Sequence, residues 1–499
     1  MTARGLALRS RHGLRLPSAA GVGLTLLVVV VSLLLALVAL SANPIAVALG
    51  AAMLLAPILI ARPTLGIWAI LLSSMLVAGT LPIWTEGSAT KVVWAISMLS
   101  FLLLFVVLVR ALVTPGFTRG TPAFVWIALA LMVFAVFTTL LQWSTAYEAL
   151  SGIKRYFQAF GLLFALAWLP LQADDFRRWR RFFVFVAAIQ LPWAIYERIR
   201  LVPIREGFKG LYPGLVPIDV VSGTFGANMT QGGASGAMAA FLILMLAFLL
   251  ARWREGLLHG TRMLMLGLLV TIPVFLGETK IAVVLLPLTF ALLYRRELLR
   301  RPHLAVLGLC VGAALTIGTV YAYLAIMDYR SLEEYFVNTL AYNFQDRGHG
   351  GFALNRTTAL HFWWVQQSWA DPLGAVLGNG LGSAHDLTGG HIALRHIGYG
   401  VGITAASSLL WDLGAVGFSL ALALPLSAWY CASRLVRHAR DAMVRADAAG
   451  IEVAMLIFVV FLFYRTDAIQ TLTFQIVFAC LFGYLAWLHR HTGVSGGPQ

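Results

Sequence analysis

Charged residues are scarce in this chain. Only 11% of its 499 residues are Asp, Glu, Lys or Arg, while 60% are hydrophobic. A soluble domain carries roughly 25% charged residues, so this composition excludes an ordinary soluble enzyme or binding domain. Apolar runs of about 20 residues recur from end to end, which is the length that an α-helix needs to cross a ~30 Å hydrocarbon layer. The composition therefore predicts an all-α polytopic membrane protein.

Cysteine is also rare, and the familiar catalytic motifs are missing. The chain has no GxxxxGK[ST] phosphate loop, no HExxH, no Asp-x-Asp pair outside the apolar runs and no GxSxG. Nucleotide hydrolysis, catalysis at a dedicated metal site and serine hydrolysis are therefore not expected, and no cofactor is predicted. A disulfide framework and a cysteine metal site are excluded because the three cysteines lie far apart in apolar runs: Cys310, Cys431 and Cys480.

The basic residues gather at alternate ends of the apolar runs. Clusters of arginine occur within 4–15, 177–181, 252–262, 295–301 and 434–445, and the net charge is +15. The positive-inside rule assigns such clusters to the cytoplasm. The positive charge is therefore a topology signal, and no nucleic-acid partner is predicted. The first apolar run, 21–41, is too long for the hydrophobic region of a cleavable signal peptide.

Hydropathy and loop charge together predict about fourteen transmembrane helices, with the N- and C-termini cytoplasmic. This divides the chain into a basic N-terminus (1–20), N-terminal helices (21–197), a core (198–432) with one large extracytoplasmic loop (327–404), and C-terminal helices with a cytoplasmic tail (433–499). The helices are expected over 21–41, 44–61, 65–84, 92–113, 122–142, 156–172, 181–197, 233–251, 262–277, 280–295, 303–325, 405–432, 451–466 and 470–488.

The loop at 327–404 is too long for an ordinary connection, so it is either functional or disordered. Its aromatic residues, among them Trp363, Trp364 and Trp369, favour an ordered structure. Short amphipathic helices are expected over 333–342 and 357–369, lying on the outer leaflet, and the sequence GNGLGS at 378–383 predicts a tight turn. A second outer segment is expected over 198–231.

Charged residues at membrane depth or in the large loop are the candidates for chemistry, because such charges are costly in an apolar surrounding. Lys280, in the turn GETK, either snorkels at a helix end or binds an anion. Arg465 and Asp467 are expected to form a structural pair, whereas Asp412 lies among apolar residues and must be paired or face a polar cavity. The loop adds cations and imidazoles suited to phosphate binding and proton transfer: Arg347, Arg356, Arg395, His349, His361, His385, His391 and His396.

Several short motifs follow one another between about residues 220 and 420. They are Gly223-Thr224-Phe225-Gly226 with Asn228, Thr279-Lys280, Asn355-Arg356-Thr357 through Trp363, Asp371-Pro372-Leu373-Gly374 with Gly378, Gly380 and Gly382, and Trp411-Asp412-Leu413-Gly414 with Gly417. Their order and spacing resemble those of the bacterial O-antigen ligase and O-antigen or exopolysaccharide polymerase superfamily. That family usually has Ser-Arg in place of Thr279-Lys280. Its ligases also carry a His where this chain has Ile403, so the resemblance favours a polymerase over a ligase.

The resemblance implies metal-independent transfer of a glycan from polyprenyl pyrophosphate to a sugar hydroxyl, at the outer face of the bacterial inner membrane. Arg356 and Lys280 would bind the pyrophosphate as fixed positive charge, and His396 first, His391 second, or Asp412 would orient or deprotonate the acceptor. The implied partners are the lipid-linked oligosaccharide donor, a glycan acceptor, membrane lipid and other polysaccharide assembly proteins. Further substrate contacts would come from Arg347, Arg205, Lys209 and Arg395.

Other classes of protein stay open. A multi-spanning transporter or flippase for lipid-linked glycans predicts internal repeats and broken helices at mid-membrane, and the two halves of the sequence show no repeat. A glycosyltransferase that uses a polyprenyl-phosphate sugar would place an acidic residue in the first outer loop, and residues 40–44 contain none. A scaffold in polysaccharide assembly is a further alternative.

Overall fold

The computed structural model of this chain describes residues 61–85, 93–208, 210–212, 215–230, 232–300, 352–367 and 370–492, with the single residues 303, 306, 333 and 337. Within these ranges all regular structure is helical. Apart from those single residues, the helices expected over 21–41, 303–325 and 333–342 lie outside the described residues. The same holds for nearly all of the helix expected over 44–61, and for Lys209 and Arg347.

Seven helices in the described part of the chain are long and apolar enough to cross a membrane. This confirms the class of α-helical membrane protein. Three shorter apolar helices accompany them: α3 with η1 (Pro63–Val77), α12 (Gly260–Leu276) and α13 (Ala282–Leu293). The seven long helices are α5 (Val93–Val113), α6 (Ala123–Leu141), α9 with its continuation (Ala173–Glu206), α11 (Ser235–Arg254), α20 (Ala405–His438), α21 (Ala442–Tyr464) and α23 (Leu472–His491).

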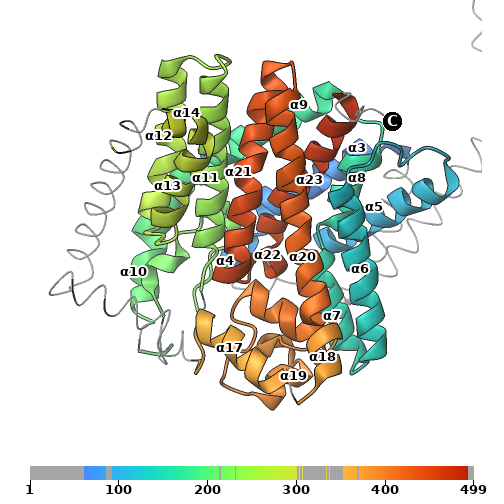
Figure 1. The fold of residues 1–499 in the computed structure, drawn as a ribbon. Helices are drawn as coiled ribbons and strands as arrows, with labels where there is room; N and C mark the ends of the chain where they lie inside the picture. The colour runs from blue at the N-terminus through green and yellow to red at the C-terminus, as the bar shows by residue number, and fades with distance from the viewer. Residues whose placement is uncertain are drawn as a thin grey trace, which may run out of the picture. The chain divides into compact units, whose positions relative to one another are not determined.

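The centre of the bundle is formed by α11, α21 and α23, together with the short helix α8 (Phe160–Trp168) (Figure 1). In α11, 89% of the most apolar stretch is buried, against 39% in α5 and in α6. A helix that is apolar all round belongs in a core, whereas one with a single buried stripe belongs at the edge. α8 packs against α5 on one side and α23 on the other.

The helix expected over 156–172 corresponds to α8, and the connection expected before it, after residue 142, contains a further helix, α7 (Ala146–Phe157). α7 begins at Thr145, whose side chain accepts the backbone N–H of Glu148 (3.2 Å), and α8 follows after a break at Gln158. The Gln158 side chain is buried at this break, where it accepts the Ser97 hydroxyl (3.0 Å) and donates to the Gln470 carbonyl (3.3 Å). One amide side chain thus holds the break in place between two neighbouring elements.

The helix expected to end at residue 197 continues in the structure. α9 (Ala173–Tyr196) passes into a π-helical turn, η3 (Glu197–Leu201), and then into α10 (Val202–Glu206). The buried Glu197 carboxylate accepts the N–H groups of Ser222 (2.8 Å) and Gly223 (2.7 Å), which ties the next loop to the helix. Residues 198–206, the first part of the outer segment expected over 198–231, are therefore helical. Arg205 is helical and its side chain is buried, because apolar neighbours such as Leu201 carry the helix onward.

The two ends of the bundle differ in character. The basic segments of α9, α11, α20 and α21 meet at one end, where α14 (Arg295–Arg300) also lies. At the opposite end lie α17 (Arg356–Gln367), α18 (Pro372–Leu377), η6 (Asp386–Thr388) and α19 (His391–Arg395). The basic end is held by ion pairs of Asp447 with Arg252 and with Arg180 (3.8 Å), Glu255 with Arg445 (2.7 Å), and Glu452 with Arg295 (2.8 Å).

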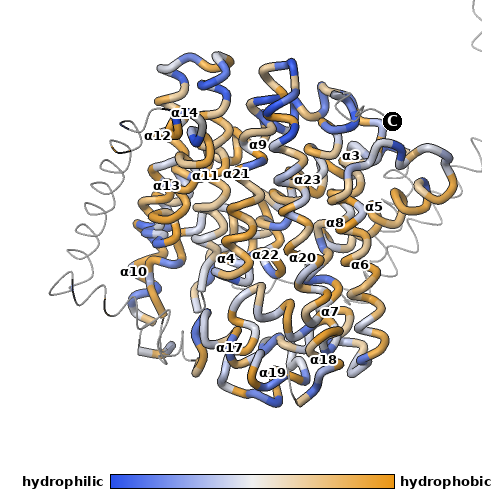
Figure 2. Tube along the Cα trace, viewed as in Figure 1, coloured by the Kyte–Doolittle hydropathy of each residue, from blue (hydrophilic) through white to orange (hydrophobic). Residues whose placement is uncertain are grey.

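Hydrophilic residues concentrate at these two ends, and the helices between them are mainly hydrophobic (Figure 2). A hydrophilic stretch also marks the turn between α12 and α13, where Glu278 and Lys280 lie. The distribution is the one expected of helices that end at the two surfaces of a membrane. We call the end that carries α17–α19 the loop end, and the other the basic end.

Candidate functional site

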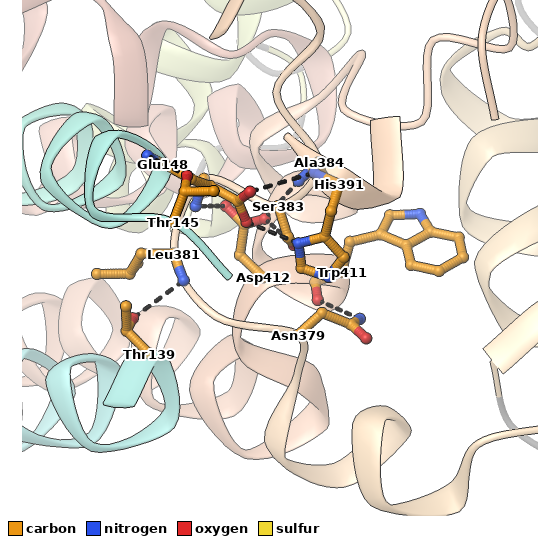
Figure 3. A network of polar contacts seen from close by, with 11 residues as sticks. Thr139, Thr145, Glu148, Asn379, Leu381, Ser383, Ala384, His391, Trp411 and Asp412 are labelled. Carbon is orange, nitrogen blue, oxygen red and sulfur yellow. Dashed lines mark hydrogen bonds and ion pairs between the residues drawn. The ribbon is translucent and has the colours of Figure 1, made fainter. Parts of the chain in front are cut away.

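The candidate site is built on a break inside α20. Gly414 has φ 63° and ψ −169°, which interrupts the helix and frees the carbonyls of Trp411 and Asp412. The Asn379 N–H donates to the first carbonyl (2.9 Å) and the Gly380 N–H to the second (2.9 Å). The predicted glycine turn at 378–383 is therefore docked onto the break (Figure 3).

Glycine is required in this turn because the two backbones touch. Gly378 has φ 85°, and a Cβ atom at this position would lie 2.4 Å from the Asp412 carbonyl oxygen. A Cβ on Gly414 would lie 2.5 Å from the Val376 backbone. Both contacts are far inside the van der Waals separation, so α18 and α20 approach this closely only because both positions are glycine.

The Asp412 side chain is fully buried and accepts four hydrogen bonds. Its Oδ1 accepts the Ser383 hydroxyl (2.7 Å) and the Ala384 N–H (2.8 Å). Its Oδ2 accepts the Tyr156 hydroxyl (2.8 Å) and the Gly382 N–H (3.1 Å). A carboxylate has about four acceptor positions, so this arrangement favours an anchor for the loop over a base that receives a substrate proton.

Beside this anchor, His391 faces the buried carboxylate of Glu148 (Figure 3). The His391 Nδ1 lies 2.7 Å from Glu148 Oε1, and the backbone N–H of His391 donates to Oε2 (3.3 Å). A carboxylate at this distance accepts a hydrogen bond from Nδ1–H, so the neutral imidazole has its lone pair on Nε2. The His391 side chain is 33% exposed. The pair thus has the composition of a general base: an oriented imidazole backed by a carboxylate.

Two cations follow Glu148 on α7. The Arg155 side chain is buried, and its Nε has no hydrogen-bond partner. In the part of the chain that the structure describes, no side-chain hydrogen bond or ion pair of Arg155 is found. Lys154 lies over the ring of Trp94, 4.7 Å from its centroid. Burial, with the charges of Arg155 and Lys154, lowers the pKa of His385 to about 3, so His385 is a neutral neighbour of this cationic pair.

A second group of cations surrounds Asp219, which lies in the short helix η4 (Pro217–Val220). Burial raises the pKa of the Asp219 carboxyl, and the charges of Arg465, Arg205 and Lys280 oppose that rise. The group therefore unites two of the predicted substrate-binding residues, Lys280 and Arg205, with one that was assigned a structural role. Arg465 does pair with Asp467, as predicted (3.0 Å), and its Nη2 also donates to the Gly233 carbonyl (3.0 Å).

Arg356 joins this second group through the residue before Arg465. Its Nε donates to the Tyr464 carbonyl (2.7 Å), and its guanidinium carbon lies 4.5 Å from the centroid of the Tyr464 ring. Glu278 pairs instead with Arg198 (2.8 Å). Arg356 therefore contacts the residue that precedes Arg465, and Lys280 and Arg205 act on Asp219 together with Arg465.

The segment 464–475, which contains α22 (Asp467–Gln470), contacts residues of both places. It includes Arg465, and its Tyr464 carbonyl accepts the hydrogen bond from Arg356. Its later residues contact the end of α7, because Gln158 donates to the Gln470 carbonyl and Gln475 donates to the Arg155 carbonyl (2.7 Å). One connection between α21 and α23 therefore contacts both Arg356 and the backbone of Arg155.

His396 and Arg395 have other surroundings. The His396 ring lies among the rings of Phe362 (5.2 Å between centroids), Trp411 (5.7 Å) and Tyr399 (6.2 Å). Burial and the neighbouring Arg395 charge lower its pKa. These contacts favour His396 as a stacking residue and His391 as the base, which reverses the predicted order of the two. Arg395 is exposed at the end of α19.

The sequence reasoning missed Glu148, Lys154, Arg155 and Asp219. A signal was present in α7, because Glu148, Ser151 and Arg155 recur at helical spacing and all three are buried. These residues lie between the helices expected over 122–142 and 156–172, so the hydropathy pattern assigns them to the connection between the two. Asp219 carries no such periodic signal.

Comparison of the sequence with models of known protein families, and with curated proteins, finds no match. The resemblance to the polymerase and ligase superfamily is carried by the short motifs alone and stays a prediction.

Proposed function

We propose that this protein transfers a glycan from polyprenyl pyrophosphate to a sugar hydroxyl, with the loop end at the outer face of the bacterial inner membrane. A polysaccharide polymerase is favoured over a ligase because this chain has Ile403 where the ligases carry a His. The proposal includes about fourteen transmembrane helices with both termini in the cytoplasm. The observation that carries it is the buried Arg155 beside Lys154, on the helix that also carries Glu148 of the His391–Glu148 pair. Among the described residues Arg155 makes no side-chain hydrogen bond or ion pair, although the charges of Asp412 and Asp386 act on it.

A buried guanidinium whose Nε donor is unsatisfied is costly even when carboxylates such as Asp412 and Asp386 lie nearby, and a directly bound anion would lower that cost. Arginine suits phosphate oxygens because its planar donors match them two at a time. Arg465, Arg205 and Lys280, whose charges act on Asp219, would add further positive charge. A pyrophosphate that gains negative charge as it departs would be stabilised by charges already held in place.

The His391–Glu148 pair supplies the other half of the reaction. The acceptor hydroxyl oxygen forms the new bond to the anomeric carbon, and its proton passes to His391 Nε2. The bond between the anomeric carbon and the phosphate oxygen breaks, and its electron pair leaves with polyprenyl pyrophosphate. Glu148 keeps the imidazole in the required tautomer and stabilises the imidazolium that forms.

The test is glycan transfer by the purified full chain in liposomes, with donor and acceptor added on the same side. This geometry makes the assay independent of any transport across the bilayer. His391→Gln should reduce the rate by about 10²- to 10⁴-fold, the usual contribution of a general base. Arg155→Gln should reduce it about a hundredfold, as expected for loss of one fixed charge at a phosphate.

His361→Gln is the matched control, because His361 is exposed on α17 in the same loop. It should leave the rate within about twofold of the wild type, a ratio worth less than 1 kcal/mol in the barrier. Equal rates for His391→Gln and His361→Gln would remove His391 from the mechanism. A wild-type protein that moves the lipid-linked glycan across the bilayer and forms no new glycosidic bond would establish the transporter alternative.

A further inference from the structure

A second candidate site lies toward the basic end, away from the residues of the candidate functional site. It is an apolar cleft between α9, α11 and α23, with single contributions from α3, α8 and α21, and the space that it encloses together with the open solvent at its mouth is about 910 Å³. Its walls are almost entirely apolar, and they include Phe176, Trp179, Leu244, Val477 and Cys480. Along α11 the lining runs from Phe241 to Arg252. At 1.5 Å per residue this is a depth of about 17 Å.

The mouth of the cavity is polar and positively charged. Asp447 accepts hydrogen bonds from the Arg252 guanidinium and from the Tyr484 hydroxyl (2.7 Å). Arg180 is held less firmly: its Nη1 lies 3.8 Å from Asp447 Oδ2 and 3.6 Å from the Met443 sulfur, and a thioether is a weak acceptor. Two guanidinium groups therefore share one carboxylate, which leaves one positive charge at the mouth.

The cavity has the dimensions of one lipid chain. Its depth of about 17 Å is close to the ~15 Å hydrocarbon thickness of a single leaflet. An unbranched chain can fill such a space without leaving an uncompensated polar group inside it. The remaining positive charge at the mouth would be neutralised by one phosphodiester, and arginine donors suit its oxygens.

We propose that this cavity binds a monoanionic glycerophospholipid, such as phosphatidylglycerol. One acyl chain lies between α9, α11 and α23, and the phosphate lies against Arg180. Basic pockets between transmembrane helices on the cytoplasmic side are suited to anionic headgroups, and the guanidinium groups of Arg180 and Arg252 line this mouth. The proposal is independent of the proposed catalytic function, because none of these residues lies at the loop end.

The test is native mass spectrometry of the purified full chain, with phosphatidylglycerol, phosphatidylethanolamine or polyprenyl phosphate added at equal concentration. The wild type should retain one phosphatidylglycerol in preference to the other two lipids. Arg180→Gln should weaken this binding about tenfold, as for loss of one charge-assisted contact. Arg178→Gln makes the same change of charge two residues away, on an exposed side chain outside the cavity, and should weaken binding less than twofold.

A variant whose side chain fills the cavity provides a second, independent test of the proposal. Leu244→Trp places a larger side chain in the chain-binding space and should abolish retention of the lipid while Arg180 is intact. If that variant does not fold, photo-crosslinking of wild type with phosphatidylglycerol that carries a diazirine on its acyl chain should label peptides of α9, α11 and α23. The proposal would be overturned if Arg180→Gln and Arg178→Gln weakened binding equally, or if the crosslinker labelled other helices. It would also be overturned if the wild type retained phosphatidylethanolamine as strongly as phosphatidylglycerol, or if it retained polyprenyl phosphate in preference to both.

Discussion

Replacing Asp412 by Asn tests whether the Asp412 carboxylate anchors the loop or takes part in catalysis. The Asn side chain keeps an oxygen that can accept the Ser383 hydroxyl and the Ala384 N–H, which lie 2.7 and 2.8 Å from Oδ1. Its NH₂ group takes the place of Oδ2, where the Tyr156 hydroxyl (2.8 Å) and the Gly382 N–H (3.1 Å) now donate. The Gly382 N–H would then face a donor in a fully buried position, and the Tyr156 hydroxyl would lose its carboxylate acceptor.

The size of the loss follows from these contacts. The charge-assisted bond from Tyr156 contributes roughly 1.5–3 kcal/mol, and leaving the buried Gly382 N–H unpaired costs roughly 1–3 kcal/mol. We therefore expect Asp412→Asn to lower the free energy of unfolding by about 3–5 kcal/mol, a large share of the 5–15 kcal/mol typical of native proteins. Tyr156→Phe removes one of the same bonds and should cost about 1.5–3 kcal/mol.

Thermal unfolding in detergent at constant lipid content measures both variants, and limited proteolysis of the region 378–404 shows whether the loop is released. The two losses should be less than additive in the double variant, because both remove the same Tyr156–Asp412 bond. An Asp412→Asn protein that unfolds like the wild type and resists proteolysis, yet has lost glycan transfer, would refute the anchor and restore Asp412 as a base.

Three further predictions concern the surroundings of the site. Burial and the charges of Arg155 and Lys154 lower the pKa of His385 from 6.5 to about 3. Between these two pH values His385 is protonated in the unfolded chain and neutral in the folded chain. Stability should therefore fall by about 1.4 kcal/mol per pH unit as the pH drops below about 6.5, and His385→Asn should flatten the dependence measured by denaturant titration between pH 4 and 7. Gly378→Ala should cost several kcal/mol because its Cβ would meet the Asp412 carbonyl at 2.4 Å. Gly389→Ala, with a similar positive φ of 66° and no atom closer than 3.9 Å, should cost only about 1 kcal/mol in the same unfolding assay. Lys280→Arg should retain glycan transfer and Lys280→Gln should lose it, with Glu278→Gln nearly unaffected because Glu278 pairs with Arg198; normal transfer by Lys280→Gln would remove Lys280 from the site.

The long helices could be predicted from the sequence because apolar runs with flanking charges are a local signal. The helices expected over 233–251, 262–277, 280–295, 405–432 and 470–488 correspond to α11, α12, α13, α20 and α23. The short helix expected over 357–369 corresponds to α17. Helix ends in basic segments were misplaced, as at α9, because arginine side chains do not end a helix when their stems lie along apolar neighbours.

The partners of the site residues could not be predicted in the same way. Asp412 is recognisable as a candidate site residue because it is a charge in an apolar run, yet Tyr156, which donates a hydrogen bond to it, is 256 positions away. Glu148 and His391 are 243 positions apart. No periodic pattern connects residues at such separations, and only the packing of α7 against the loop brings them together. The break at Gln158 was missed for a related reason, because one amide in an apolar run does not reveal that it bonds to α5 and α22.

The break in α20 explains why the position of the loop depends on a membrane helix. An interruption within an apolar span would leave carbonyls unpaired, at a cost of several kcal/mol each in hydrocarbon. Here the missing donors are supplied by the glycine turn, through the N–H groups of Asn379 and Gly380. The turn has therefore one favourable position, and Asp412 fixes the residues that follow it. Ser383 then receives the N–H groups of Ile392 and Ala393 on its carbonyl (3.1 and 3.0 Å), which sets the start of α19 and directs His391 toward Glu148.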